Sequence, residues 1–387
     1  MRVAILGAGP AGLYAAYLLK RQWPETDVRV FEQNPADATF GFGVVFSDRA
    51  LAFLNEDDPE TYQAIVPALE TWEDITLTHR GETIRIDGVG FAAIGRLHLL
   101  QLLQARARSV GVEPLYEHVV TNLDELGEAD LVIGADGANS LVRRRHEAAF
   151  GTSVSLLSNR FVWFGTTRPF RTLTQTFKTA GEGHFNAHHY RFKPDMSTFI
   201  VEVDEATFFR AGFDRMSEDE TKAVCERVFA AELDGHPLVS NKSVWRQFPK
   251  IRNERWSVGN KVLVGDALRT AHFSIGSGTR LAMEDVIALV RAIGEHPQDM
   301  PAALRAYEAA RRPVVEKLVT AANTSADWYE HFAEHMRLEP WDFAMSYIGR
   351  SGRIDPDRLR QVSPRFVAAY EAHRSAARRS LSPERTS

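Results

Sequence analysis

The chain opens with an apolar run that leads directly into a glycine-rich turn. Residues 2–6, RVAIL, have the composition of a fully buried strand of a parallel sheet. The following GAGPAG places Gly7, Gly9 and Gly12 in a G-x-G-x-x-G frame. The stretch PAGLYAAYLLKRQW then has helical spacing, and DVRVFEQN indicates a second strand. This order of strand, glycine turn, helix and strand predicts a βαβ unit and an α/β fold.

Each glycine of the turn has its own expected role. Gly7 allows the tight turn, Gly9 lets the backbone approach a pyrophosphate, and Gly12 lets the helix pack closely on the strand. Glu32 lies 20 residues after Gly12, at the end of the second strand, where a carboxylate can bind ribose hydroxyls. The frame therefore predicts a dinucleotide at the helix N-terminus, where free N–H groups favour anions. The alternative is a tight packing turn without a ligand.

Composition excludes several other classes of protein. The 387 residues, 44% of them hydrophobic, suffice for two domains. A net charge of -5 gives no electrostatic case for nucleic acid or an anionic membrane as partner. The single Cys225 excludes an internal disulfide and a cysteine-only metal site. No stretch resembles a signal peptide or reaches the ~20 apolar residues of a membrane span, so we expect a soluble cytoplasmic protein, either monomeric or homodimeric.

Further elements are indicated by their apolar patterns. The region from about 155 to 250 is rich in aromatic and β-branched residues, as antiparallel strands are. We expect Pro313 to kink a helical C-terminal region. The remaining predicted elements are a hairpin at 75–87 turning at Arg80-Gly81, helices at 95–111 and 279–294, and buried strands within 129–137 and 261–265.

These elements predict a Rossmann-like domain assembled from discontinuous segments, with an inserted, mostly antiparallel β domain and C-terminal helices. The charged, small-residue-rich end of the chain indicates disorder. The expected boundaries are 1–72, 92–150 and 255–300 for the nucleotide-binding domain, 73–91 and 151–254 for the substrate domain, 301–375 for a C-terminal helical region and 376–387 for a disordered tail.

Two further loops indicate which dinucleotide binds. GADGANS (134–140) places Asp136 directly after a predicted strand, and GDALRTAHFSIGSGT (265–279) follows another. Asp266 is suited to accept hydrogen bonds from a polyol such as the ribityl chain of FAD, although a simple helix cap is the alternative. The turn at 276–279 exposes N–H groups that would stabilise the negative charge of a reduced flavin. An NAD-dependent dehydrogenase would instead have one contiguous Rossmann fold.

The three loops together resemble those of the single-component FAD-dependent aromatic hydroxylases of the p-hydroxybenzoate hydroxylase type. Arg96 in GRLHLLQLL matches the arginine that begins a helix and contacts FAD in that family. The resemblance is closer to enzymes that act on aryl-CoA thioesters, namely salicylyl-CoA 5-hydroxylases and the monooxygenase half of anthraniloyl-CoA enzymes. The stretches that carry it are FGFGVVFSD (40–48), RFVWFGT (160–166), MSTFIVE (196–202) and AHFSIGSGT (271–279).

The resemblance implies a cofactor, a set of contacts and a reaction. FAD is reduced by transiently bound NADH or NADPH, O₂ adds to form a C4a-hydroperoxyflavin, and one oxygen is transferred to an electron-rich ring. The FGFGVVF loop would lie against the flavin. The expected cofactor contacts are Gly7, Gly9, Pro10, Ala11, Gly12, Glu32, Gln33, Val45, Arg96, Asp136, Asp266, Gly276, Ser277, Gly278 and Thr279.

The aromatic strands supply the expected substrate side chains. In GHFNAHHYRF, period-2 alternation places His184, Asn186, His188 and Tyr190 on one face. We expect Asn186 and Tyr190 to bind substrate and His188 to position or deprotonate a phenolic hydroxyl. Hydrogen-bonded structural side chains are the alternative, and a metal site is not expected because His184 and His188 would lie ~13 Å apart on a strand.

A second pair of candidates lies next to the flavin loop. His272 is the alternative catalytic histidine, and Phe273 is expected to bind substrate. Many relatives have a Pro-Pro pair at these two positions, so the phenol-activating contacts of the family do not transfer directly.

Three functions fit these features. The first is hydroxylation of an aryl-CoA, most specifically salicylyl-CoA at ring position 5, para to its hydroxyl group. The second is hydroxylation of a tryptophan or indole derivative, because MSTFIVE and HFSIG also resemble a hydroxylase of violacein biosynthesis. The third is a flavin-binding sensor without turnover. Only scattered arginines are available for CoA, and the Trp-x-Trp-x-Ile-Pro signature of flavin halogenases is absent.

Overall fold

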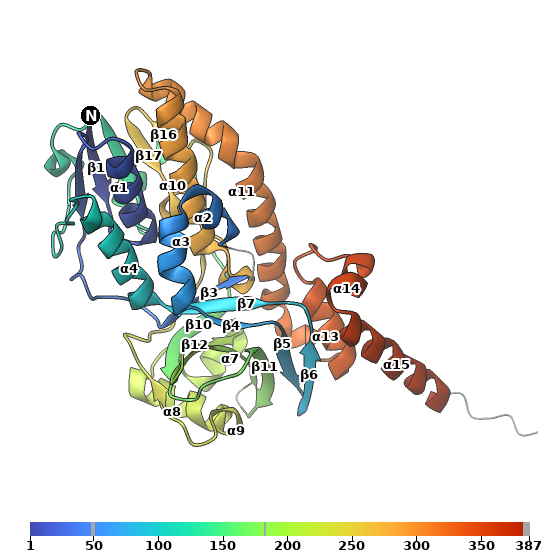
Figure 1. Cartoon of the computed structure of the whole chain (residues 1–387). Helices are drawn as coiled ribbons and strands as arrows, with labels where there is room; N and C mark the ends of the chain where they lie inside the picture. Colours follow the sequence, from blue (N-terminus) through green and yellow to red (C-terminus); the bar gives the residue numbers. More distant parts are fainter. Residues whose placement is uncertain (48–50, 182, 382–387) are drawn as a thin grey trace, which may run out of the picture. The chain divides into compact units, whose positions relative to one another are not determined.

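The computed structural model describes residues 1–47, 51–181 and 183–381, and the chain divides into two compact units (Figure 1). Each unit is built from three segments that alternate along the chain. The first unit comprises Met1–Leu69, Ile94–Leu157 and Gln247–Asn323, and the second comprises Glu70–Ala93, Ser158–Arg246 and Thr324–Ser387.

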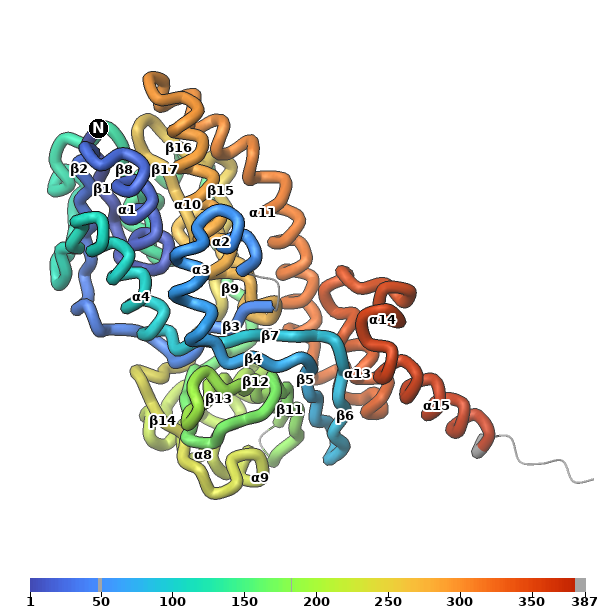
Figure 2. The backbone as a smooth tube through the Cα atoms, in the orientation of Figure 1, coloured from blue at the N-terminus to red at the C-terminus, as the bar shows by residue number. Residues whose placement is uncertain are grey.

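The first unit contains the predicted parallel sheet. Its strand order is β16-β17-β8-β1-β2, and all neighbours are parallel except β16 and β17. The strands are β1 (Arg2–Leu6), β2 (Asp27–Phe31), β8 (Leu131–Gly134), β16 (Ser257–Val258) and β17 (Lys261–Leu263). Helix α1 (Pro10–Gln22) packs against both α4 (Arg96–Ser109) and α10 (Gly278–Glu295), as Figure 2 also shows. Four of the five β1 residues are buried, which explains the continuous apolar run in the sequence.

Shorter elements complete the first unit. Strands β9 (Thr152–Leu156) and β15 (Pro249–Asn253) form an antiparallel pair. The other elements are β3 (Gly43–Ser47), α2 (Ala52–Asp57), α3 (Pro59–Ile65), α5 (Leu141–Arg145), α6 (Glu147–Phe150), and the short 3₁₀ helices η1 (Val66–Ala68), η2 (Leu123–Leu126), η3 (Gly265–Ala267) and η4 (Phe273–Ile275).

The second unit is built on a seven-stranded sheet in the order β14-β10-β13-β12-β11-β5-β6. Every neighbouring pair is antiparallel except β11 and β5. Beside this sheet, β4 (Glu70–Trp72) pairs with residues 91–93 of β7 (Phe91–Gly95). The sheet strands are β5 (Ile75–His79), β6 (Glu82–Ile86), β10 (Arg160–Thr166), β11 (Leu173–Ala180), β12 (Gly183–Lys193), β13 (Met196–Val203) and β14 (Leu238–Val239).

The two faces of this sheet differ in what covers them. Phe185 and Ala187 of β12 belong to an apolar cluster with helices α7 (Glu205–Ala211), α8 (Glu218–Val228) and α9 (Ala230–Leu233). On the opposite face, Phe177 contacts aromatic rings of the C-terminal helices. Asn186 pairs directly with Phe177 in the sheet register, so it shares this second face. The alternation predicted for β12 is confirmed.

The C-terminal part of the chain corrects two expectations. Residues 301–375 are not a unit of their own, because α11 (Met300–Glu330) runs through Pro313 and contributes to both units. Residues 376–381 are helical, since α15 spans Pro364–Leu381, and 382–387 lie outside the described residues. Alanine and arginine are strong helix formers, so their enrichment here favours helix over disorder.

The remaining C-terminal helices are short. They are α12 (Phe332–His335), α13 (Pro340–Gly349) and α14 (Pro356–Val362). Asp87 fixes the start of α15 by accepting hydrogen bonds from the backbone N–H groups of Arg365 (3.2 Å) and Phe366 (2.8 Å). No helix in the described part of the chain is long and apolar enough to cross a membrane.

Candidate active site

The glycine turn of the first unit has the geometry that its sequence predicts. Gly7 has φ +101°, and a methyl group there would lie 2.5 Å from the carbonyl oxygen of Ala135. A methyl group at Gly12 would lie 1.9 Å from the carbonyl oxygen of Gly7, so α1 packs directly on the turn. At Gly9, no described protein atom lies within 4 Å of such a methyl group. The space beside Gly9 is therefore open to a ligand.

The N-terminus of α1 is suited to an anion. Its N-cap residue, Gly9, makes no side-chain cap, and Pro10 begins the helix. Nearby, the carboxylate of Glu32 accepts hydrogen bonds from the N–H groups of Ala8 (2.8 Å) and Asn34 (2.9 Å). Glu32 thus lies beside the glycine turn with lone pairs remaining for ribose hydroxyls. Gln33 is exposed directly after it.

The second predicted loop adjoins the first. Asp136 follows β8, and a methyl group at Gly7 would lie 2.9 Å from its Cα. Its Oδ2 accepts a hydrogen bond from the Leu141 N–H (2.6 Å), whereas Oδ1 is buried without a partner among the described residues. Desolvation raises the pKa of this carboxyl group. An unpaired buried oxygen at this position fits a donor from a bound cofactor.

The third predicted loop lies against the same helix start. Gly265 has φ +60°, and a methyl group there would lie 3.5 Å from the Cβ of Ala11. The neighbouring Asp266 is solvent-exposed, but the surrounding protein desolvates it enough to raise its pKa, which the charges of Arg269 and Arg96 partly offset. The first unit therefore brings the Gly7, Asp136 and Asp266 loops together, with Arg96 close to Asp266.

The start of α10 offers a second set of free N–H groups. Gly276 has φ +59°, and the N-cap Ser277 makes no side-chain cap of the helix. Gly278 begins the helix, and a methyl group there would meet no described atom within 4 Å. Thr279 follows in the first turn, and Val45 on β3 is half-buried. Ser277 is 5% exposed, whereas Gly276, Gly278 and Thr279 are half-buried, so part of this turn is accessible to a ligand.

A buried ion pair that the sequence analysis did not identify holds this third loop in place. Asp285 of α10 is fully buried, and its Oδ2 lies 2.6 Å from Nη1 of Arg269. The same oxygen accepts a hydrogen bond from the Gly265 N–H at 3.2 Å, and Arg311 lies 3.4 Å from the other oxygen. Asp285 lies on the apolar face of α10. A charged residue on such a face indicates a buried ion pair, and this is the sequence signal that could have identified the pair.

His272 and Phe273 also belong to the first unit. His272 is 3% exposed, its Nδ1 lies 2.8 Å from Oγ of Ser274, and it caps η4. Its ring is stacked with that of Phe273 at 4.3 Å and contacts Phe248 edge-on at 4.9 Å. These contacts indicate that His272 supports the loop, while Phe273 is half-buried.

In the second unit, the predicted substrate strand carries buried polar groups. Asn186, His188 and Tyr190 are at most 5% exposed. Burial, with a smaller contribution from the charge of Arg350, lowers the pKa of His188 to about 3. His188 is therefore neutral at physiological pH and is a weak base, although it can still hydrogen-bond a substrate. His184, at the start of the strand, is only half-buried.

Glu202 is the functional candidate that the sequence analysis missed. It lies directly opposite Asn186 on β13 and is 3% exposed. Its Oε1 accepts a hydrogen bond from Nδ2 of Asn159 (2.9 Å), and its Oε2 is buried without a partner among the described residues. Desolvation is the main cause that raises its pKa to about 8. This carboxyl group is protonated at neutral pH and can exchange a proton near that pH at little cost.

Comparison with known proteins identifies the class. Residues 101–322 match a family model described as an FAD binding domain, and residues 5–37 match an NAD(P)-binding Rossmann-like domain. The chain belongs to the FAD-dependent aromatic monooxygenases, flavoproteins that use O₂ and NAD(P)H to hydroxylate aromatic compounds. The open space at Gly9, the uncapped start of α10 and the unpaired oxygen of Asp136 all fit FAD.

Particular relatives differ in the compounds that they act on. The chain is 44% identical over 361 residues to a salicyloyl-CoA 5-hydroxylase from Streptomyces sp, covering 91% of this chain and 70% of that protein. It is 36% identical to a 3-hydroxy-4-methyl-anthranilyl-[aryl-carrier protein] 5-monooxygenase from Streptosporangium sibiricum, covering 85% and 89%. Protodeoxyviolaceinate monooxygenase from Chromobacterium violaceum is 34% identical, with 92% and 96% covered.

A solved structure shares the fold. The crystal structure of 2-methyl-3-hydroxypyridine-5-carboxylic acid oxygenase superimposes with a TM-score of 0.71 at 19% identity, covering 93% of this chain and 96% of that one.

Proposed function

We propose that the protein hydroxylates the ring of an aryl-CoA thioester, with salicylyl-CoA as substrate and 5-hydroxysalicylyl-CoA as product. The observation that most directly supports this proposal is the 44% identity to a salicyloyl-CoA 5-hydroxylase across 91% of the chain. Position 5 is para to the ring hydroxyl, which donates electron density to it. One oxygen atom of O₂ enters the ring, and the other leaves as water with the two electrons of NADH or NADPH.

The first unit holds the cofactor in this proposal. The N–H groups at the start of α1 bind the pyrophosphate beside Gly9, Glu32 binds the ribose, and Asp266 binds the ribityl chain. The backbone at 276–279 stabilises negative charge on the reduced ring system. Bound FAD supplies the activation of O₂ that no side chain can supply.

The second unit binds the aromatic group through its buried polar face. Asn186 and neutral His188 orient the ring hydroxyl by hydrogen bonds, and Tyr190 packs against the ring. The ionised form of Glu202, whose share grows as the pH approaches its pKa of about 8, accepts the phenolic proton as electron density moves into the ring, whereas His188 is too weak a base. The burial of this face excludes water.

The test is NADH and NADPH oxidation by the purified flavoprotein with salicylyl-CoA, free salicylate and tryptophan in parallel, with products analysed by mass. We expect strong stimulation by salicylyl-CoA alone and a product that is one oxygen atom heavier. Stimulation by free salicylate alone would contradict the requirement for a thioester. Substitution His188→Ala should lower both turnover and the yield of product per NADH, and unchanged values would remove His188 from the site.

A second candidate is hydroxylation of a tryptophan-derived compound. The 34% identity to protodeoxyviolaceinate monooxygenase over 92% of the chain favours it. It predicts that an indole substrate, and not salicylyl-CoA, stimulates NADH oxidation. A flavin-binding sensor would show no stimulation by any aromatic compound.

A further inference from the structure

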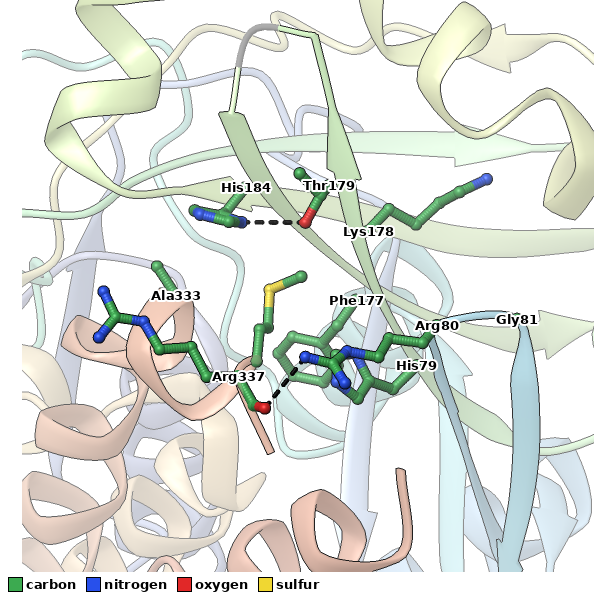
Figure 3. A pocket seen from close by; sticks show the side chains of 10 residues that line it. His79, Arg80, Gly81, Phe177, Lys178, Thr179, His184, Ala333 and Arg337 are labelled. Carbon is green, nitrogen blue, oxygen red and sulfur yellow. Dashed lines mark hydrogen bonds between the residues drawn. The ribbon is translucent and has the colours of Figure 1, made fainter. Parts of the chain in front are cut away.

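The second unit contains a cavity of about 430 Å³ at the turn ends of strands β5, β11 and β12 (Figure 3). This volume lies within the range that small-molecule ligands occupy. Four separate stretches of the unit line the cavity, which indicates a formed pocket and not a gap beside one loop. Its lining residues are His79, Arg80, Gly81, Phe177, Lys178, Thr179, His184, Ala333, Met336 and Arg337.

The cavity has an apolar floor and a cationic rim. Phe177 and Met336 are at most 6% exposed, whereas Arg80 and Arg337 are exposed. No Asp or Glu occurs among these lining residues. Arg80 pairs with Glu339 at 2.7 Å, and Lys178 pairs with Glu232 at 2.9 Å.

Arg337 differs from the other two cations. Within the part of the chain that the structure describes, its guanidinium group has no ion-pair partner, so its charge is available to an anion. Its backbone oxygen accepts a hydrogen bond from Arg80 at 3.0 Å, which places the Arg80 side chain beside the Arg337 backbone. Guanidinium groups match the geometry of phosphate oxygens.

His184 lies on the other side of the cavity from Arg80 (Figure 3). Figure 3 shows His184 and Thr179 opposite Arg80 and Phe177. The Nδ1 of His184 lies 3.1 Å from Oγ1 of Thr179, which orients the imidazole. The Nε2 of His184 then remains available to a ligand oxygen.

The cavity floor and the buried polar face share one side of the sheet. Phe177 pairs with Asn186, and the next same-face residue of β11, Gln175, pairs with His188. His184 and His188 are four residues apart on β12, which is about 13 Å along a strand. The cavity and the buried polar face are thus two separate sites along one side of the sheet. A CoA thioester has two matching groups, because its acyl group and its phosphorylated adenosine lie at opposite ends of an extended arm.

We propose that this cavity binds the 3′-phosphorylated ADP end of a CoA thioester, with Arg337 and His184 contacting phosphate oxygens and the apolar floor contacting adenine. This assignment rests on the proposed function for the thioester itself. It gives the CoA group a defined site on the same side of the sheet as the residues that orient the ring.

The test uses adenosine 3′,5′-bisphosphate, which carries the nucleotide but no thioester, and the FAD-loaded protein. Calorimetric titration should show binding, and Arg337→Ala should weaken it by about tenfold, as expected for loss of one charged contact. Arg337→Lys should restore part of the affinity. Arg215→Ala is the control, because Arg215 is 80% exposed and does not line the cavity. The KM for salicylyl-CoA should rise with Arg337→Ala but not with Arg215→Ala.

Three results of the binding experiment would overturn the proposal. They are no binding of the bisphosphate, equal weakening by both alanine variants, and displacement by inorganic phosphate at the same concentration, which would identify a simple anion site. A different result would contradict the proposed function, namely that the protein does not hydroxylate salicylyl-CoA. If salicylyl-CoA is hydroxylated and Arg337→Ala leaves both affinity and KM unchanged, only the cavity assignment is wrong.

Discussion

Glu202 is a buried carboxyl group that forms no ion pair within the described part of the chain. Asn159 donates a hydrogen bond to it, desolvation raises its pKa, and the charge of the nearby Glu330 raises the pKa further. Between about pH 6.5 and 8, the folded protein keeps a proton at Glu202 that the unfolded chain has lost. The free energy of unfolding should therefore fall as the pH rises through this range. The unfolded chain still holds part of a proton at His188 up to about pH 7.5, but this contribution is the same in the wild type and in a Glu202 variant, so the difference between the two isolates Glu202.

Glu202→Gln should remove this dependence. The wild type should lose about 2 kcal/mol more than the variant between pH ~6.5 and ~8, since each pKa unit corresponds to about 1.36 kcal/mol. Urea unfolding at several pH values measures the difference. Glu205→Gln is the matched control, because the Glu205 side chain is 56% exposed. Parallel curves for the wild type and Glu202→Gln would show that Glu202 is ionised in the folded state.

His188 and Glu202 should also differ in their effects on catalysis. With a pKa of about 3, His188 stays neutral throughout the working range, so His188→Gln should lower kcat by about tenfold or more without changing the shape of the pH profile. Glu202→Gln should remove the ionisation near pH 8 from that profile. Steady-state rates of product formation from about pH 6 to 9.5 separate the two. If His188→Gln, and not Glu202→Gln, removes the ionisation near pH 8 from the profile, His188 is the titrating base and Glu202 is not.

Glu202 also shows where sequence reasoning ends at the residue scale. The alternation of β12 was readable because Phe185 and Ala187 are apolar while Asn186 and His188 are polar. In β13, seven of eight residues are buried, so MSTFIVEV has no alternation between an exposed and a buried side. That Glu202 faces Asn186 depends on the register between two strands, which a single sequence does not specify.

At the scale of one element, the start of α1 offers a pair of matched substitutions. Gly12→Ala should destabilise the fold by about 1–3 kcal/mol or more, because the new methyl group would lie 1.9 Å from the Gly7 oxygen. Gly9→Ala should leave the apoprotein stable, since no described atom lies within 4 Å of its methyl group, but should weaken FAD binding by at least about tenfold. Thermal unfolding of the apoprotein and flavin titration measure the two effects. A Gly9→Ala protein that binds FAD normally would place the pyrophosphate elsewhere.

Helix α10 depends on the ion pair beneath its first turns. Asp285→Asn should lower the free energy of unfolding by about 3–5 kcal/mol, because it leaves the buried guanidinium of Arg269 less compensated. Glu295→Gln, at an exposed position of the same helix, should have little effect. Chemical denaturation with flavin fluorescence reports both stability and FAD retention. A stable Asp285→Asn protein would show that the Gly265–Arg269 segment is held by packing alone.

The elements that the sequence predicted best are those whose signals are local. β1, α1 and β2 follow from an apolar strand, three glycines at fixed spacing and a helical repeat within 31 residues. The end of α15 was predicted wrongly because charge and small size were interpreted as disorder, although Ala376 and Ala377 favour a helix. The cavity at Arg337 was not predictable, since its walls come from stretches more than 250 residues apart.

At the scale of the whole molecule, one cofactor has to connect three distant parts of the chain. The first unit consists of three chain segments, and segments of the second unit lie between them in the sequence. The Gly7, Asp136 and Asp266 loops each belong to a different one of these three segments. A ligand that contacts all three stabilises the assembled unit, by about 2.7 kcal/mol when its free concentration is about 100 times Kd. Removal of FAD should therefore loosen these loops together.

Hydrogen exchange on the apoprotein and the FAD-loaded protein tests this coupling. FAD should slow exchange at residues 7–12, 136–141 and 265–279 by a similar factor, because opening any one loop releases the ligand from the other two. Helix α8 of the second unit, whose buried Val224 and Cys225 belong to a separate apolar cluster, should exchange at the same rate in both states. Protection limited to residues 7–12 would mean that the three loops bind no common ligand. Equal protection in α8 would mean that FAD stabilises the chain as one cooperative body.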